Sequence, residues 1–133
     1  MHTPLDARIF LRTFNGVARL AHDNAIQHGF WEPGEARNDG QMIALMHSEL
    51  SEGLENIRKL PMDASDPNAI ELNGRLYFRS DHIPEYAGIE EELADVIIRI
   101  MDNAVARGWR VPEAVLAKMA FNESRTYKHG KAF

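Results

Sequence analysis

The stretch that decides the fold is Gln41–Lys59, QMIALMHSELSEGLENIRK, because acidic residues interrupt its apolar face. Its apolar side chains recur at helical spacing and form one arc, which comprises Met42, Ile43, Met46, Leu50, Leu54 and Ile57, with Leu45 at the edge. At about 100° per residue, Glu49 falls on this packed side and Glu52 at its margin. A charged group on the packed side of a helix is costly unless something pairs with it. We therefore expect a helix whose carboxylates have a partner.

A second stretch, Ile89–Arg107, repeats the spacing. Glu92 and Asp95 are three residues apart, and Arg99 continues the same stripe. The apolar side of this stretch comprises Leu93, Val96, Ile97, Ile100, Met101 and Ala104. Such a stripe is by itself more often a solvated face. Two antiparallel helices packed through their apolar arcs would, however, bring both carboxylate pairs to one seam.

Four carboxylates in one seam repel one another. At a separation of about 5 Å and an effective dielectric constant of about 20, each like-charged pair costs roughly 3 kcal/mol. Divalent cations offset this repulsion, and an all-oxygen ligand set suits Mg²⁺ or Mn²⁺ rather than zinc. Such ions keep coordination positions for water and for substrate phosphates. The pattern indicates Mg²⁺-dependent chemistry on a phosphorylated substrate.

The rest of the chain predicts two further helices and one small insert. Helical periodicity covers Leu5–Gly29, and a helix beginning at Pro112 is expected to end near Thr126. Between the acidic helices, residues 61–88 are rich in Pro, Asn, Asp and Ser. Within them, Asn73-Gly74 separates two short apolar runs and predicts a β-hairpin. The expected fold class is all-α, a four-helix bundle with a β-hairpin insert between the second and third helices.

Composition narrows the possible functions. The 133 residues suit a single domain spanning 1–133, and the net charge of −5 argues against nucleic acid as a partner. The chain has no Cys, which excludes disulfides, Cys-ligated metals and a Cys nucleophile. No apolar run approaches the roughly 20 residues that span a bilayer, so we expect no membrane association and a cytoplasmic location.

Two motifs in order carry a resemblance to a known family. His47-Ser48-Glu49-Leu50-Ser51-Glu52 followed by Glu92-Leu93-Ala94-Asp95-Val96 resembles the ExxE and ExxD signature of MazG-like all-α nucleoside triphosphate pyrophosphohydrolases. The resemblance extends to His28-Gly29-Phe30-Trp31 and to the closing segment with His129-Gly130-Lys131. It covers nearly the whole chain except the insert, and it implies the MazG-like form of the four-helix fold.

The resemblance implies hydrolysis of a (deoxy)nucleoside triphosphate to the monophosphate and pyrophosphate. The resemblance implies two or three Mg²⁺ ions, with Mn²⁺ as a substitute. Their ligands, which are also the catalytic groups, would be Glu49, Glu52, Glu92 and Asp95. Those implied as phosphate ligands are Lys118, Asn122, Arg125, Lys128 and Lys131. Separately from the resemblance, Asn24, His28 and Trp31 lie just before the first acidic helix and could contact the base, although aromatic residues at a helix end more often pack into the core. Such enzymes work as a homodimer or a dimer of dimers, which suits the broad apolar arc of the third helix.

Several alternatives stay open. The phage-type, MazZ-like members act on dGTP or GTP, and we favour these substrates. A phage-encoded enzyme would act in the host cytoplasm. Other compact relatives act on dUTP or dCTP. Ser48 stands where many members carry an additional acid, so the general base is unassigned. A non-catalytic helical module that binds metal or nucleotide is the main rival. A di-iron bundle is disfavoured, since neither Glu49 nor Glu92 is followed by His at the required spacing.

Overall fold

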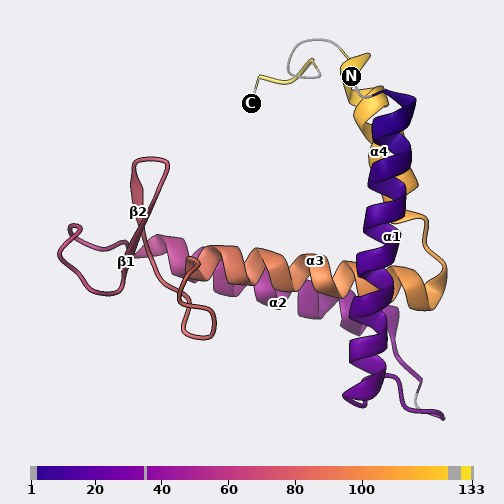
Figure 1. The fold of residues 1–133 in the computed structure, drawn as a ribbon, viewed down its shortest axis with the longest axis horizontal. Helices are drawn as coiled ribbons and strands as arrows, with labels where there is room; N and C mark the ends of the chain where they lie inside the picture. Colours follow the sequence, from indigo (N-terminus) through magenta and orange to yellow (C-terminus); the bar gives the residue numbers. More distant parts are fainter. Residues whose placement is uncertain (1–2, 35, 126–129, 133) are drawn as a thin grey trace. The chain divides into compact units, whose positions relative to one another are not determined.

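The computed structural model describes residues 3–34, 36–125 and 130–132. Within these residues the chain is mostly helical and carries one antiparallel hairpin (Figure 1). The elements follow the order α1 (Pro4–Gln27), α2 (Asp39–Arg58), β1 (Ala69–Leu72), β2 (Arg75–Phe78), α3 (Gly88–Arg107) and α4 (Val111–Glu123). This confirms the mostly helical class and the hairpin insert. The fourth helix ends before the expected Thr126, which lies outside the described residues together with Lys128.

Local sequence signals set the helix ends. Thr3 caps α1 through a capping box with Asp6, and Asn38 caps α2 by accepting a hydrogen bond from the backbone N–H of Gln41. Gly108, with a φ of 69°, follows the end of α3, and Pro112 lies in the first turn of α4. These ends lie within a few residues of those predicted from the sequence.

The chain divides into two compact units, and each is described by itself. The terminal unit comprises residues 1–30 and 101–133, and the central unit comprises residues 31–100. In the terminal unit α1 packs against α4. Its buried residues include Ala18, Ala104 and Pro112. Nδ1 of His22 lies 2.7 Å from a carboxylate oxygen of Asp102, which fixes α1 to the end of α3.

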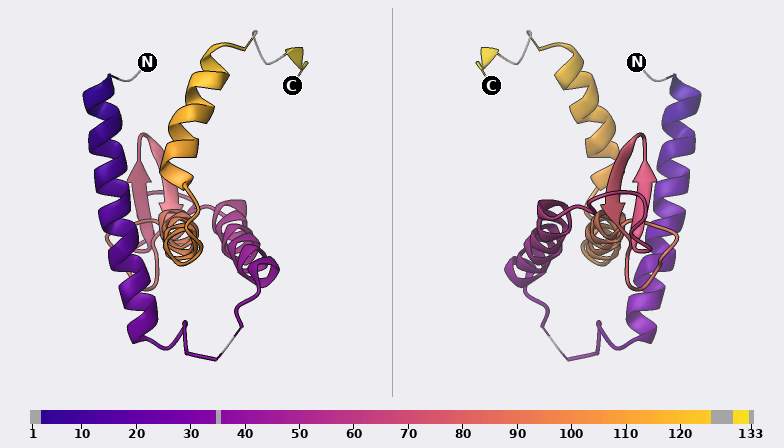
Figure 2. Two further views of the ribbon diagram at one scale, coloured as in Figure 1. Left: turned by 90° about the vertical axis from the view of Figure 1, so that its right-hand side faces the viewer. Right: turned by 90° about the vertical axis from the view of Figure 1, so that its left-hand side faces the viewer.

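In the central unit, α2 and the first part of α3 run side by side in opposite directions (Figures 1 and 2). Two glycines allow a close approach. A Cβ atom on Gly53 would lie 3.0 Å from Cδ1 of Ile89, and one on Gly88 would lie 2.2 Å from Oδ1 of Asn56. The buried face of α2 therefore consists of Met42, Met46 and Gly53.

This packing agrees only in part with the expected contact through the apolar arcs, because Met42 and Met46 are buried but the other members of the α2 arc are not. Large apolar side chains of α2 and α3 are exposed in the single chain, namely Ile43, Leu45, Leu50, Leu54, Ile57, Leu93, Ile97 and Ile98. The buried positions of α2 are one edge of the predicted arc, Met42 and Met46, together with the small Gly53. A helical wheel places the apolar arc correctly but does not show which face a neighbouring helix will cover.

The insert is a compact extension of the central unit. Ala69 pairs with Phe78 and Leu72 with Arg75, and the turn residues Asn73 and Gly74 have φ values of 52° and 80°. Positive φ at both positions is the geometry that the Asn-Gly pair favours. Across the part of the chain that the structure describes, no helix combines the length and apolar character that crossing a membrane requires.

Candidate metal centre

Three carboxylates from two helices meet at the seam between α2 and α3. Oxygen atoms of Glu49, on α2, and of Glu92 and Asp95, on α3, all lie within 4.8 Å of one another. Glu92 is buried, and the other two are half-buried. The spacing of three residues puts both acids of α3 on one face of the helix, as predicted. Three of the four predicted ligands therefore come together.

The carboxyl group of Glu92 has a strongly raised pKa. Burial raises its pKa to about 8, with further increases from hydrogen bonds with Glu49 and Glu52 and from their negative charges. Its Oε2 atom is buried and makes no hydrogen bond within the described ranges. A buried carboxylate oxygen with neither a donor nor a cation beside it carries a large desolvation cost. Oε2 of Glu92 therefore has no partner, and a bound cation could supply one.

Asp95 and Glu52 complete the acidic environment. Burial raises the pKa of Asp95, and the negative charges of Glu49 and Glu91 raise it further. The positive charge of Arg99 partly lowers it. Glu52, the fourth predicted ligand, is exposed at the margin of the seam and lies outside the group of three. It still contributes to the raised pKa of Glu92. The structure thus places it beside the cluster rather than within it.

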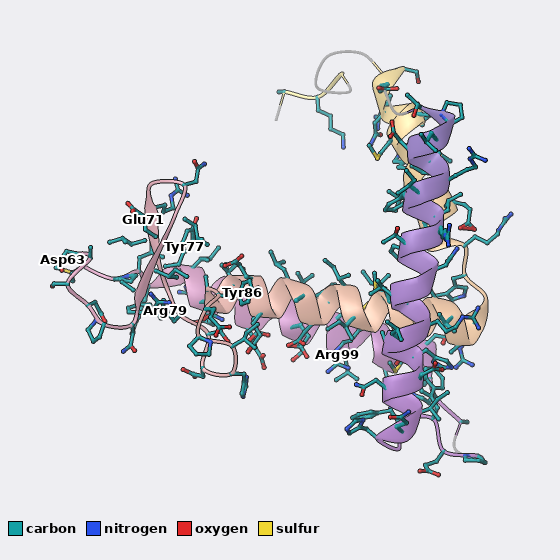
Figure 3. The ribbon with its side chains drawn as sticks, viewed as in Figure 1. Asp63, Glu71, Tyr77, Arg79, Tyr86 and Arg99 are labelled. Atoms are coloured by element: carbon teal, nitrogen blue, oxygen red, sulfur yellow. The ribbon has the colours of Figure 1, made fainter. Side chains whose placement is uncertain are left out.

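Arg99 is a member of the site to which sequence reasoning gave no role. Its Nε and Nη2 atoms donate hydrogen bonds of 3.2 and 2.9 Å to Oε1 of Glu49 (Arg99 is labelled in Figure 3). This ion pair joins α3 to α2 across the seam. With every acid ionised, the four predicted ligands and Arg99 carry −4 + 1 = −3, so the arginine neutralises only part of the negative charge.

Glu91, next to the cluster, is held by the insert. Oγ of Ser80 donates a 2.7 Å hydrogen bond to Oε1 of Glu91, and Nδ1 of His82 lies 3.0 Å from the same oxygen. The Ser80 hydrogen bond is the main reason that the pKa of Glu91 is lowered. Ser48, where many resembling proteins carry an acid, is exposed. Glu91 is thus an additional acid next to Glu92 in the sequence, but its carboxylate is bound to the insert.

The predicted phosphate ligands lie in the terminal unit. Lys118 and Asn122 are exposed on α4, and Arg125 follows its end. The cations of Lys118 and Arg125 lie 4.5 and 5.4 Å from the ring centre of Phe121. Lys131 is also exposed, whereas Lys128 lies outside the described residues. Their contact with phosphate stays a prediction.

The predicted base contacts are divided between the two units. In the terminal unit, Nδ1 of His28 lies 2.8 Å from the backbone oxygen of Asn24. In the central unit, the guanidinium of Arg37 lies 4.3 Å from the ring centre of Trp31. Arg37 therefore stacks on one face of the indole ring. The assignment of these residues to a base stays a prediction.

The residues of the seam fit a divalent cation. The three clustered ligands offer only carboxylate oxygens, which are the donors that Mg²⁺ and Mn²⁺ prefer, and one buried oxygen has no other partner. The ion pair of Arg99 with Glu49 engages one of the possible ligand atoms, so a bound cation would share Glu49 with the arginine.

Comparisons with known proteins give no family: no family model matches the chain, and no curated protein or solved structure matches it significantly. The class that the fold and the site define is a mostly helical chain with a hairpin insert and an acidic seam that could hold a metal ion.

Proposed function

We propose that the chain is a Mg²⁺-dependent nucleoside triphosphate pyrophosphohydrolase of the MazG-like type. The observation that carries the proposal is the meeting of Glu49, Glu92 and Asp95 from two antiparallel helices, with an oxygen of Glu92 left without a hydrogen-bond partner. Their order along the chain is that of the family signature. The MazG-like form of the fold belongs to the same proposal.

The residues would divide the chemistry as follows. Glu49, Glu92 and Asp95 would hold Mg²⁺, and Glu52 would add charge or a further ligand at the margin. The ions would lower the pKa of a bound water and neutralise charge on the phosphates. Arg99 would keep Glu49 in place while the site is metal-free. Lys118 and Arg125 would contact substrate phosphates, with Asn122, Lys128 and Lys131 assisting.

The direct test measures pyrophosphate and monophosphate release from eight nucleotides, four ribo and four deoxy, with Mg²⁺, Mn²⁺ or EDTA. We expect metal-dependent release, with dGTP or GTP preferred. Asp95→Asn should reduce kcat at least 100-fold, since removal of a ligand for a catalytic ion costs several kcal/mol of transition-state stabilisation. Glu71→Gln, which changes an exposed acid of the hairpin, is the matched control. Release that EDTA leaves unchanged would contradict the proposal.

A non-catalytic metal-binding or nucleotide-binding module is the second candidate. The ion pair between Arg99 and Glu49 and the exposed Ser48 favour it, because both reduce the acidic groups available to activate water. Such a module would bind nucleotide in the presence of Mg²⁺ but release no pyrophosphate. The same assay, combined with equilibrium binding, separates the two candidates.

A homodimer or a dimer of dimers is also part of the proposal. The exposed side chains of Leu50, Leu54 and Leu93 belong to apolar arcs that a second copy would cover. Burial of these arcs would add apolar contact on the faces of α2 and α3 that the single chain leaves exposed.

A further inference from the structure

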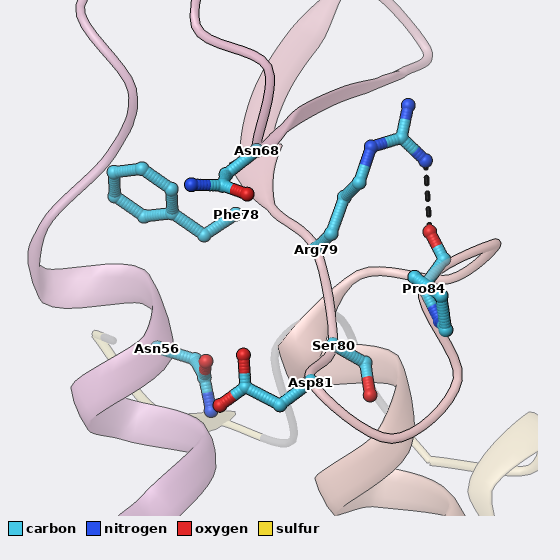
Figure 4. A pocket seen from close by; sticks show the side chains of 7 residues that line it. All are labelled: Asn56, Asn68, Phe78, Arg79, Ser80, Asp81 and Pro84. Atoms are coloured by element: carbon cyan, nitrogen blue, oxygen red, sulfur yellow. Dashed lines mark hydrogen bonds between the residues drawn. The ribbon is translucent and has the colours of Figure 1, made fainter.

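A pocket of about 490 Å³ opens between the end of α2 and the insert (Figure 4). This volume lies within the range of small-molecule sites in proteins. Asn56 of α2 contributes to one wall, and Asn68, Phe78 and Asp81 of the insert contribute to the others. In Figure 4, Phe78 and Asn68 lie together on one side of the pocket, while Asn56 and Asp81 point toward one another on the other side.

The loop that carries Asp81 is held in place by several hydrogen bonds. Nη1 of Arg79 donates to the backbone oxygen of Pro84 at 2.8 Å. Oγ of Ser80, which is 4% exposed, accepts hydrogen bonds from the backbone N–H groups of His82 and Ile83 at 3.2 and 3.0 Å. The loop around Asp81 is therefore ordered before any ligand binds.

Two polar side chains that line the pocket, those of Asn68 and Asp81, are exposed to solvent. Within the ranges that the structure describes, neither the carboxamide of Asn68 nor the carboxylate of Asp81 makes a side-chain hydrogen bond. The ring of Phe78 is half-buried and makes no stacking contact with another described aromatic ring. One flat apolar surface, one acceptor-only group and one group that both donates and accepts thus face the same space.

These groups match a guanine base. An aromatic ring stacks on any nucleobase, but a carboxylate presents two acceptor oxygens and no donor. Guanine alone among the common bases has two adjacent donors, N1–H and the 2-amino group, on its pairing edge. Adenine and cytosine place an acceptor nitrogen beside their amino group, which a carboxylate repels. The carboxamide of Asn68 could donate to the guanine O6 atom.

The pocket wall at Asn56 lies about two helical turns from Glu49 along α2. Asn56 donates from Nδ2 to the backbone oxygen of Glu52 at 2.9 Å, and it lies seven residues after Glu49 on the same face of α2. Seven residues correspond to about 10 Å along a helix, a distance that a ribose and an α-phosphate can bridge. The hydrogen bond from Ser80 to Glu91 ties the opposite wall to α3 next to Glu92.

We infer that this pocket binds the guanine base of the triphosphate substrate, with Phe78 stacking on the base and Asp81 and Asn68 reading its edge. The inference rests on the proposed function in one respect, which is the placement of the substrate phosphates at the metal centre. It assigns base selection to the insert rather than to Asn24, His28 and Trp31.

The test measures binding of dGMP, dAMP and dIMP to the full chain by calorimetry, which needs no turnover. We expect dGMP to bind about 10- to 100-fold more tightly than dAMP, with dIMP in between because it lacks the 2-amino donor. Asp81→Asn should abolish this preference. Phe78→Leu, which keeps most of the apolar volume, should weaken dGMP and dAMP alike by about 10-fold. Glu85→Gln removes a charge from the same loop outside the pocket and should change nothing.

The outcomes distinguish this inference from the proposed function. Guanine preference that survives in Asp81→Asn, or that is lost in Trp31→Ala instead, overturns the pocket assignment even if triphosphates are hydrolysed. Failure of dGMP to bind the wild-type chain overturns it as well. Selective dGMP binding that depends on Asp81, without hydrolysis of any triphosphate, supports the pocket and rejects the pyrophosphohydrolase.

Discussion

Glu92 is the residue at which burial and repulsion between the acids of the seam have their largest effect on the pKa. Its carboxyl group is buried beside two other acids, and its pKa of about 8 means that it is largely protonated at neutral pH without a cation. A cation must displace that proton, because Mg²⁺ binds the ionised form. The same residue is thus a predicted ligand and the reason that metal binding should depend on pH.

The first prediction concerns stability without metal. Between its ordinary pKa of 4.5 and about 8, the folded chain retains a proton on Glu92 that the unfolded chain has lost. In EDTA, the free energy of unfolding should therefore fall as the pH rises through this range, on the order of 1–3 kcal/mol after allowance for solvent screening. Urea unfolding at pH 5, 6.5 and 8 measures the fall. Glu92→Gln should remove it, whereas Glu71→Gln should retain it; an unchanged slope in Glu92→Gln would show that another group is responsible.

The second prediction concerns Arg99, whose positive charge partly neutralises the acids of the seam when no cation is bound. Arg99→Gln should destabilise the metal-free protein by about 1–3 kcal/mol, because Glu49 loses a charged hydrogen-bond partner. Saturating Mg²⁺ should reduce that loss, since the cation takes over part of the neutralisation. Unfolding free energies with EDTA and with Mg²⁺ provide the comparison. An equal loss in both conditions would show that the arginine and the cation do not share Glu49.

At the residue scale, the sequence predicted the placement of the acids better than that of Arg99, which pairs with one of them. The position of Glu49 within the apolar arc correctly placed it at a packed face, and the spacing of Glu92 and Asp95 correctly placed them together. Helical periodicity does not show how far a long side chain extends, so the ion pair of Arg99 with Glu49 was not foreseen. Because Glu49→Gln would also deprive Arg99 of its partner, Asp95→Asn is the cleaner variant for testing the metal centre.

Among the elements, the hairpin was the easiest to predict and the seam the hardest. Asn73-Gly74 specifies a tight turn through local backbone preference alone. The contact of α2 with α3 depends instead on small residues at its centre, Gly53 and Gly88, whose role emerges only when the second helix is in place. Apolar periodicity gives more weight to large side chains, so it centred the packed face on residues that are exposed in the single chain, whereas only one edge of the predicted arc, Met42 and Met46, is buried.

The third prediction concerns the attachment of the insert to α3. Ser80→Ala removes a hydrogen bond to Glu91 and leaves the backbone N–H groups of His82 and Ile83 without their acceptor. We expect a loss of about 1–3 kcal/mol and faster hydrogen exchange at those two amides. Ser65→Ala is the matched control, because among the described residues Oγ of Ser65 donates only to the nearby Asp63, in an exposed part of the insert. Equal exchange rates in wild type and Ser80→Ala would mean that the loop is held in another way.

For the whole molecule, the exposed apolar arcs are the main unexplained feature of the single chain. The fourth prediction is that a second copy covers them. Sedimentation at micromolar concentration should give a dimer or tetramer, and Leu50→Glu combined with Leu54→Glu should shift it to the monomer, because each charge would have to be buried. His47→Glu, on the exposed polar side of α2, should leave the mass unchanged. A wild-type monomer would contradict the proposed oligomer.

The claim on which the rest depends is that the seam between α2 and α3 binds a divalent cation. Titration with Mn²⁺, followed by electron paramagnetic resonance of the free ion, tests it without any assumption about substrate. We predict saturable binding that strengthens as the pH rises toward 8 and that Asp95→Asn weakens at least 10-fold, while Glu71→Gln leaves it unchanged. Absence of saturable binding, or equal binding by Asp95→Asn and the wild-type chain, would contradict the account.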